Sequence, residues 1–348
     1  MPGSPRLKVF WDPVQLRHDP RFFLQRGLVR RNFEVPARAE ALLDGVHALG
    51  LVPQTPPAPD REALEAVHTS AYLDFLRDAA AEWDAVPDHG PELVANIHPS
   101  PEMLAQGAQI GDTIMGRLGW FTADTACPIG PDTWPAALAA AACAIAAADE
   151  AAAGRHAYAL ARPPGHHAYP ARAGGHCYLN NAAIAAERLR ARGAVRVAVL
   201  DIDSHHGNGT QGAFWERPDV LFVSVHGDTR GYYPWYVGHA GERGGGAGLG
   251  ANVNLPLPRG ADDAAWLGAL DLGLAALVRF KPDALVLSLG FDASEHEPLG
   301  FLRVTADGFA RAGEAVAGLR VPTATIQEGG YDLAGLGPLL ERSLRPFC

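Results

Sequence analysis

Residues 198–209 read Ala-Val-Leu-Asp-Ile-Asp-Ser-His-His-Gly-Asn-Gly, so an apolar segment here turns abruptly polar. The β-branched run that begins at Val195 predicts a buried strand, because short apolar runs of this kind are typical of strands. Asp203 and His205 lie two residues apart, and on an extended backbone their side chains point to the same side. One oxygen and one nitrogen ligand then converge, as a divalent metal ion requires. Taken alone, the stretch fits a solvated acidic turn equally well.

Apolar strand-like segments alternate with helical segments along most of the chain. The predicted strands are 7–11, 157–160, 195–202, 220–225, 284–289 and 322–326. The predicted helices are 37–49, 69–83, 136–153, 181–192, 262–280 and 307–319. This alternation predicts an α/β fold, in which a parallel sheet has helices on both faces. No change of composition marks a linker, so we expect residues 1–348 to form a single domain.

The unusual polar residues follow the predicted strands. They lie in the segments 162–167, 201–206, 224–228, 290–292 and 327–331. The carboxyl ends of parallel strands meet at one edge of a sheet, which is where α/β proteins bind their ligands. Five polar or glycine-rich turns at this edge predict an active site.

Asp292 is the natural third ligand beside Asp203 and His205. Three protein ligands leave open positions for water and substrate, which is typical of a catalytic zinc site. Such a metal polarises a carbonyl group and lowers the pKa of bound water. His166 and His167 are adjacent in sequence, so general acid–base catalysis suits them better than metal binding.

Three further residues complete this predicted site. Asp201 and Asn208 are available to hold the second ring nitrogens of the two histidines. Tyr331 follows two glycines, and its hydroxyl could donate a hydrogen bond to a developing oxyanion.

The composition excludes several classes of partner. The chain has 29 Lys and Arg against 39 Asp and Glu, a net charge of −10, without a basic block, so we expect no nucleic-acid partner. The four cysteines lack metal-site spacing, and no apolar signal segment begins the chain, so we expect a cytoplasmic protein. The alanine-rich segment 136–153 is expected to be too weakly hydrophobic to span a membrane.

Four motifs together resemble the signature of the histone deacetylase superfamily, and in particular its bacterial acetylpolyamine amidohydrolases and histone deacetylase-like amidohydrolases. They are Arg162-Pro-Pro-Gly-His-His-Ala168, Asp201-Ile-Asp-Ser-His-His-Gly-Asn-Gly-Thr210, Gly290-Phe-Asp-Ala293 and Glu328-Gly-Gly-Tyr331. The resemblance implies an arginase/deacetylase-like fold with a central, mostly parallel sheet of about eight strands. It also implies a zinc-dependent enzyme that removes acetyl or other acyl groups from primary amines.

The resemblance implies a role for each of these residues. Zinc would be bound by Asp203, His205 and Asp292. The general base would be His167, whose second ring nitrogen would pair with Asn208. Some relatives carry aspartate at the position of Asn208. The amide supplies no negative charge, so His167 should be less basic than with a carboxylate partner. His166, paired with Asp201, would stay protonated and act through its charge. Tyr331 and the metal would together bind the oxyanion of the tetrahedral intermediate.

Two potassium sites and a substrate tunnel are also implied by the resemblance alone. One potassium ion would lie beneath the zinc, and a second would bind backbone oxygens. The first ion would be bound by Asp201 and Ser224 and by backbone oxygens of Asp203, His205 and Val225. The second would be bound by backbone oxygens near Phe214, Arg217 and Val220. The tunnel would be formed by Gly175, His176, Tyr233 and Leu299. The acidic residues with which polyamine-specific relatives bind a distal ammonium have no clear counterpart here.

Several functions stay open at this point. Acetylated polyamines or diamines are the first substrate class, acetyl-lysine in proteins or peptides is the second, and some other amide is the third. A non-catalytic acyl-lysine binding module would have lost part of the site, whereas all of it is present. A two-metal ureohydrolase would need carboxylates where Gly207 and Ser294 stand. Ferrous iron fits the same three ligands as zinc.

The segment 12–36 is expected to be a long loop with a functional or contact role. It carries Phe22 and Phe23, which we expect to be exposed at a subunit contact or at the tunnel mouth. In the related amidohydrolases this region helps to form a dimer, so the resemblance implies a homodimer acting on small molecules.

Overall fold

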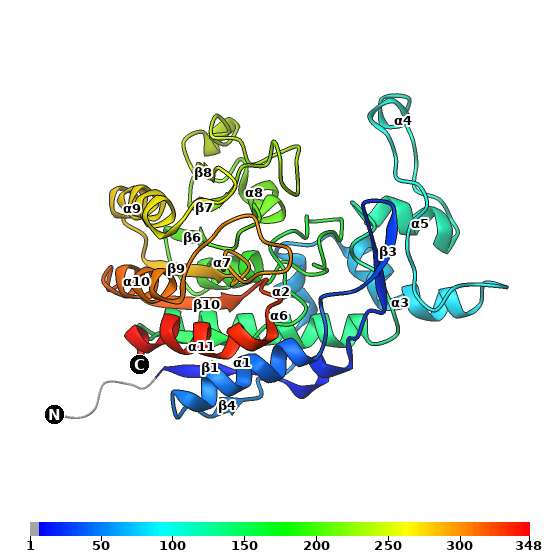
Figure 1. Ribbon diagram of the computed structural model, residues 1–348. Helices are drawn as coiled ribbons and strands as arrows, with labels where there is room; N and C mark the ends of the chain where they lie inside the picture. The colour runs from blue at the N-terminus through cyan, green and yellow to red at the C-terminus, as the bar shows by residue number, and fades with distance from the viewer. Residues whose placement is uncertain (1–6) are drawn as a thin grey trace.

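The structure is a computed structural model that describes residues 7–348. Its centre is an eight-stranded sheet in the order β4-β1-β5-β10-β9-β6-β7-β8, and every strand pair in it is parallel (Figure 1). The strands are β1 (Lys8–Phe10), β4 (Pro53–Gln54), β5 (Ala157–Ala159), β6 (Val197–Asp201), β7 (Val220–Gly227), β8 (Asn252–Leu257), β9 (Ala284–Leu289) and β10 (Thr323–Gln327). The predicted α/β fold with a parallel sheet is therefore confirmed.

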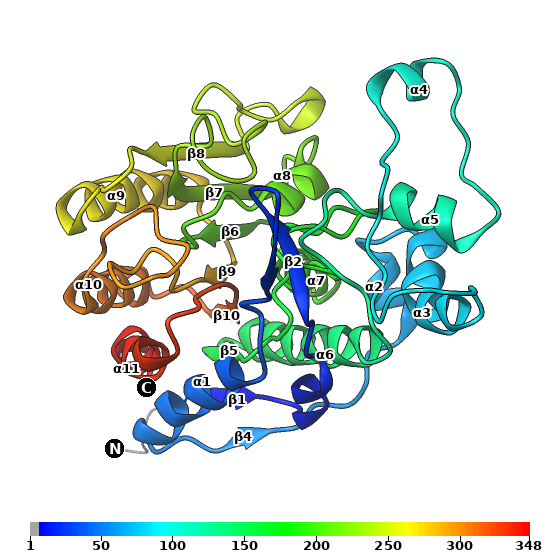
Figure 2. The ribbon, with the colours of Figure 1, turned by 45° about the vertical axis from the view of Figure 1, so that its right-hand side comes forward.

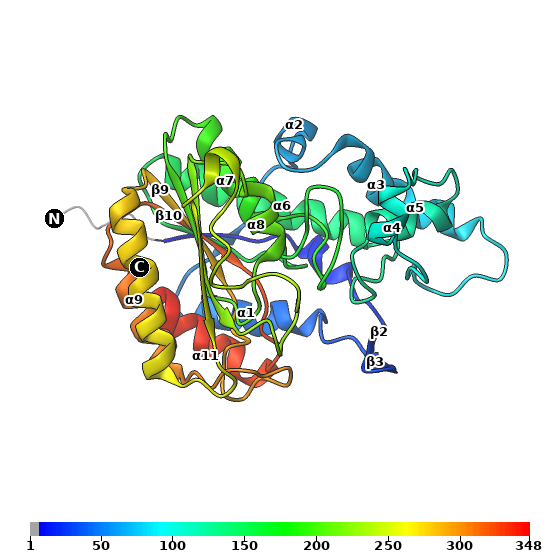
Figure 3. The ribbon, with the colours of Figure 1, turned by 90° about the horizontal axis from the view of Figure 1, so that it is seen from above.

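The helices lie mainly in two layers, one on each face of the sheet (Figure 3). They are α1 (Ala37–Ala48), α2 (Arg61–Glu65), α3 (Ser70–Asp84), α4 (Pro101–Ala105), α5 (Ile114–Phe121), α6 (Thr133–Ala152), α7 (Asn181–Ala191), α8 (Asn208–Phe214), α9 (Asp263–Phe280), α10 (Ala306–Ala317) and α11 (Leu333–Leu344). Viewed from above, α6, α7 and α8 lie on one side of the sheet, and α1, α9 and α11 lie on the other (Figure 3). Because both faces are covered, every residue of β5, β6, β7, β9 and β10 is buried.

The alanine-rich helix α6 packs directly against the sheet and against α7. Small side chains allow this close approach, and alanine favours the helical conformation. Contrary to the sequence expectation, α6 is long and apolar enough to cross a membrane, and it is the only such helix in the part of the chain that the structure describes. Most of its residues are nevertheless buried inside the protein, as in the core helix of a globular fold.

Helix α7, which begins close to the site, has a side-chain cap. Asn180 accepts a hydrogen bond from the backbone N–H of Ala183 at the start of α7, at 2.9 Å. Its amide nitrogen also donates to the carbonyl oxygen of Ala168, at 3.0 Å. One buried side chain thus joins the start of α7 to the loop that carries the adjacent histidines.

The sequence suggested that the segment 12–36 is a long loop, but the structure shows that it contains regular elements. It contains a short 3₁₀ helix (Pro13–Arg17) and an antiparallel hairpin of β2 (Phe22–Gln25) and β3 (Leu28–Arg31). The hairpin lies in front of the sheet in Figure 2, and the outlying segment that holds α3, α4 and α5 lies at the right of the same view. The prediction that Phe22 and Phe23 are both exposed is wrong for Phe23, which is buried.

Candidate active site

Three potential metal ligands meet at the carboxyl ends of β6 and β9. Asp203 and His205 follow β6, and Asp292 follows β9. Their ligand atoms all lie within 4.8 Å of one another, and Nδ1 of His205 is 2.7 Å from Oδ2 of Asp292. Both carboxylates are fully buried, and His205 is partly exposed to the cavity. Two buried carboxylates and one imidazole that converge in this way fit a divalent cation, because burying such charges without one is costly.

The glycines around this cluster allow the strand ends to approach one another. A Cβ atom added to Gly290 would lie 2.0 Å from a carboxylate oxygen of Asp203. The N–H of Gly329 donates to Oδ2 of Asp203 at 2.8 Å. A Cβ atom on Gly329 would lie 2.7 Å from the same oxygen. The ligand geometry therefore depends on Gly290 after β9 and on Gly329 after β10.

The adjacent histidines have different hydrogen-bond partners. Nδ1 of His166 lies 2.9 Å from Oδ2 of Asp201, and Nδ1 of His167 lies 2.6 Å from Oδ1 of Asn208. An amide oxygen can only accept, so Nδ1 of His167 carries the proton and Nε2 is left as an acceptor.

The same environment separates the pKa values of the two histidines. Burial alone would lower the pKa of His166, but Asp201 and Asp203 outweigh it and raise that pKa well above its usual value. Burial lowers the pKa of His167 well below its usual value, and the charge of His166 adds to the effect. The pair therefore consists of one imidazolium and one neutral imidazole.

The loop with the histidines is also held by its backbone. Helix α8 donates the N–H of Gly209 to the carbonyl oxygen of His166 at 3.0 Å. On the other side, Oε2 of Glu328 accepts from the N–H groups of Gly165 and His166, at 2.7 and 3.1 Å. Glu328 belongs to a motif quoted from the sequence, but no role was predicted for it. The buried Glu328 side chain thus holds the backbone that leads into both histidines.

Tyr331 lines the same cavity as the metal cluster and the two histidines. Its backbone N–H donates to Oε2 of Glu297 at 2.9 Å, and the guanidinium of Arg38 lies 4.6 Å from its ring centroid. Burial raises the pKa of the phenol well above its usual value, so the hydroxyl keeps its proton at neutral pH. Tyr331 is thus available as a neutral hydrogen-bond donor.

The cavity has a volume of about 680 Å³ and contains all four predicted tunnel residues. The ring of Tyr233 lies 4.9 Å from that of His167, and the ring of His176 lies 5.9 Å from that of Tyr331. Gly175 and Leu299 complete the set. Phe23 of the β2–β3 hairpin is a further wall residue that packs edge-on against His176.

Asp124 is a wall residue that the sequence analysis did not identify. Its Oδ2 accepts from the hydroxyl of Tyr233 at 2.5 Å and from the N–H of Gly175 at 3.1 Å. A Cβ atom on Gly175 would lie 2.4 Å from the ring of His167, and the backbone there has a φ of +54°. The carboxylate thus fixes a close approach that only glycine permits. No motif near Asp124 indicated this, because Gly175 and Tyr233 lie 51 and 109 residues away from it in the chain.

Glu34 is a buried acid that does not line the cavity. It is fully buried between Arg38 and Arg162. Arg38 continues the network through its hydrogen bonds to the carbonyl oxygens of Gly330 and Glu328, at 2.6 and 2.7 Å. Glu34 therefore supports the loop that carries Tyr331 through its ion pair with Arg38.

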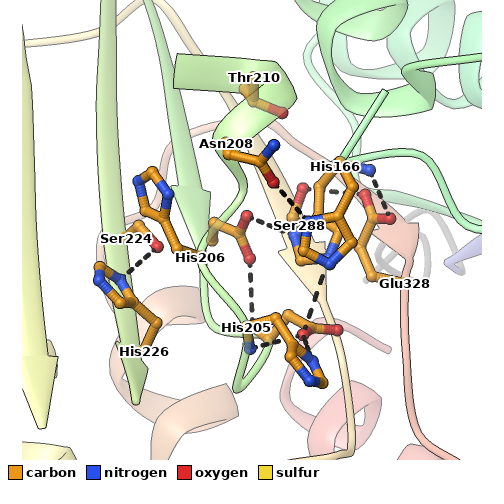
Figure 4. Close-up of polar contacts among 12 residues, drawn as sticks. His166, His205, His206, Asn208, Thr210, Ser224, His226, Ser288 and Glu328 are labelled. Carbon is orange, nitrogen blue, oxygen red and sulfur yellow. Dashed lines mark hydrogen bonds and ion pairs between the residues drawn. The ribbon is translucent and has the colours of Figure 1, made fainter. Parts of the chain in front are cut away.

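The residues predicted to bind potassium lie at two places along β7. Asp201 and Ser224 are paired across β6 and β7, close to Val225. Phe214 and Arg217 lie before the strand, joined by a backbone hydrogen bond of 3.0 Å, and Val220 begins it. Oγ of Ser224 also lies 2.9 Å from Nδ1 of His226, a buried strand residue that the sequence analysis had placed in a loop (Figure 4).

Residues 32–345 match the model of the histone deacetylase domain. The chain belongs to the histone deacetylase domain family. It is 46% identical to an acetylpolyamine amidohydrolase of Burkholderia pseudomallei, over 94% of this chain and 95% of that protein. Acetylpolyamine amidohydrolase 1 of Pseudomonas aeruginosa is 43% identical, over 95% of both chains.

A solved structure agrees with the family assignment. The crystal structure of acetylpolyamine aminohydrolase from Burkholderia pseudomallei matches with a TM-score of 0.94 and 44% sequence identity, over 98% of both chains. The two folds are thus similar over almost the whole length of both chains.

Proposed function

We propose that this protein is a zinc-dependent amidohydrolase that removes acetyl groups from acetylated polyamines or diamines. The observation that carries the proposal is one cavity in which the Asp203–His205–Asp292 cluster, the two histidines and Tyr331 converge. Relatives named acetylpolyamine amidohydrolase, alike over nearly the whole chain, support this substrate class. We also propose that residues 1–348 form a single catalytic domain.

The geometry suits hydrolysis of an amide. A divalent metal bound by Asp203, His205 and Asp292 would polarise the acetyl carbonyl and acidify a water molecule. Nε2 of the neutral His167 accepts the proton of the attacking water and returns it to the leaving amine. The charge of His166 and the hydroxyl of Tyr331 stabilise the negative oxygen of the tetrahedral intermediate. The rings of His176 and Tyr233 enclose the substrate chain.

Other parts of the assignment are proposals of the same kind. Zinc is proposed over ferrous iron, and potassium is proposed at the two places along β7. The β2–β3 hairpin presents Leu28 and Val29 with 53% and 70% of their surface exposed, which supports a contact between two copies in a homodimer. We also propose that the enzyme is cytoplasmic and acts on free small molecules.

The function is tested by parallel kinetics on acetylputrescine, acetylspermidine and an acetyl-lysine peptide. We expect both acetylamines to be hydrolysed with a much higher kcat/KM than the peptide. Chelation followed by dialysis should abolish turnover, and zinc should restore it, because the remaining groups cannot activate water alone. A preference for the peptide would identify a protein deacetylase, and full activity without metal would contradict the mechanism.

Replacement of Asn208 by aspartate should shift the pH profile. A carboxylate beside Nδ1 favours the imidazolium form and raises the pKa of His167. Since the base must be neutral, the acid limb of the kcat/KM profile should move to higher pH by about 1–3 units. Asn208→Ala is the control, because it removes the hydrogen bond without adding charge and should not move the limb upward. An unchanged limb in Asn208→Asp would exclude His167 as the titrating base.

A further inference from the structure

His176 differs from His166 and His167, with which it lines the cavity. His166 and His167 each pair Nδ1 with an oxygen of Asp201 or Asn208. Within residues 7–348, neither ring nitrogen of His176 has a hydrogen-bond partner, although only 7% of the residue is exposed. Burying an unpaired polar group is unfavourable, and a phenyl ring at this position would avoid that cost. The wall of the cavity thus holds a hydrogen-bonding ring that has no partner in the protein.

The two nitrogens of His176 differ in their access to the cavity. Nδ1 is enclosed by the protein, whereas Nε2 is not, so Nε2 is the atom that a ligand can reach. Burial lowers the pKa of the ring to about 4, although the charges of Glu34 and Asp124 oppose this shift. The imidazole is therefore neutral at pH 7 and carries a single proton. With that proton on Nδ1, Nε2 offers a lone pair to the cavity.

The ring contacts of His176 place it beside the path of the substrate. On one side it packs against Tyr331, with the ring centroids 5.9 Å apart. On another side it packs against Phe23 of the β2–β3 hairpin, with a centroid distance of 5.6 Å. In the proposed mechanism Tyr331 binds the oxygen of the acetyl group. A chain that runs outward from that group therefore passes His176 a few methylene groups beyond the amide.

The other ring of the tunnel, Tyr233, already has a partner. Its hydroxyl donates to Oδ2 of Asp124 at 2.5 Å. His176 is thus the tunnel ring that is left to bind a polar group of the substrate. A neutral acceptor of this kind fits a donor that carries positive charge, because charge-assisted hydrogen bonds are stronger than neutral ones. Acetylated polyamines and diamines have such a donor in the next nitrogen along the chain.

We propose that Nε2 of His176 accepts a hydrogen bond from the first ammonium nitrogen beyond the acetamide. His176 then selects acetylated amines in which a short polymethylene spacer separates this nitrogen from the amide. Chains that carry only methylene groups at this place leave the imidazole unpaired and bind less well. The proposal rests on the proposed function, because it takes the acetyl group to lie at the metal cluster.

The test compares monoacetylated diamines of increasing chain length with alkyl acetamides of the same length, which end in a methyl group. In the wild-type holoenzyme, the ratio of kcat/KM for diamine over alkyl acetamide should peak at the length at which the ammonium reaches Nε2. His176→Phe should lower this peak about tenfold, because phenyl keeps the ring contacts but has no lone pair. The loss should lie mainly in KM, since the hydrogen bond forms in the bound substrate as well as in the transition state.

His296→Phe is the matched control, because His296 is exposed and does not line the cavity. It should leave the ratio and the position of its peak as in the wild type. Equal ratios at every length in the wild type and in His176→Phe would overturn the role of His176.

A wild-type enzyme that hydrolyses neither series would contradict the proposed function. Calorimetric titration of both proteins with the acetylated diamines then decides the role of His176 separately. Weaker binding by His176→Phe than by the wild type supports that role, and equal affinities overturn it.

Discussion

Replacement of Tyr331 by phenylalanine is expected to lower kcat by about 10²–10³-fold, because one hydrogen-bond donor to the developing oxyanion is removed. The ring would keep its contacts, since Arg38 packs over its face and Glu297 binds the backbone N–H rather than the hydroxyl. KM should change little, because the interaction forms mainly in the transition state. Steady-state kinetics on acetylputrescine at saturating zinc measures both quantities.

Tyr236→Phe is the control for this prediction. Tyr236 is 86% exposed and does not line the cavity, so catalysis should not need its hydroxyl. Zinc content and the thermal unfolding midpoint of both variants should match the wild type. A Tyr331→Phe enzyme with wild-type kcat would show that the oxyanion is stabilised without this hydroxyl.

Replacement of Glu34 by glutamine should lower the free energy of unfolding by about 3–5 kcal/mol, because it leaves buried positive charges without their partner. Glu34 is fully buried, and its carboxylate lies between Arg38 and Arg162. Arg38 also binds the carbonyl oxygen of Gly330, so the loss should reach the adjacent Tyr331 and reduce kcat. Urea denaturation followed by tryptophan fluorescence measures the stability.

The control for this variant is Glu65→Gln. Glu65 accepts from Arg61 at 2.6 Å in an exposed pair, and exposed pairs add little to stability because water screens them. Its urea midpoint should stay close to that of the wild type. A Glu34→Gln protein as stable as the wild type would show that the two arginines are neutralised by other groups.

The central part of the fold could be predicted from the sequence, and the edges could not. Buried parallel strands are continuous apolar runs, and β9 begins and ends where the sequence indicated. The edge strands β4 and β8 were missed, because each contains proline and β8 alternates polar and apolar residues. Helix α11 was missed as well, since Pro338 and its glycines disfavour a helix until packing against α1 and α10 stabilises it.

The chemistry of the site was predictable where it is written in short motifs. His166, Asp201 and their neighbours lie at strand ends, so their convergence follows from the parallel sheet. The supporting contacts were not predictable, because they join residues distant in the chain. Asp124 meets Tyr233 across 109 positions, and Arg38 meets Gly330 across 292. Nothing in the local sequence around either residue distinguishes it from an ordinary surface charge.

The place of β10 in the sheet has a consequence for how the protein is made. This strand is the last of the sheet in the chain, yet it pairs with β5 on one side and with β9 on the other. While the ribosome is still extending the chain, the facing edges of β5 and β9 therefore lack the strand that joins them. We expect nascent chains that stop before residue 323 to be caught by chaperones or degraded, because unpaired strand edges associate readily with other chains.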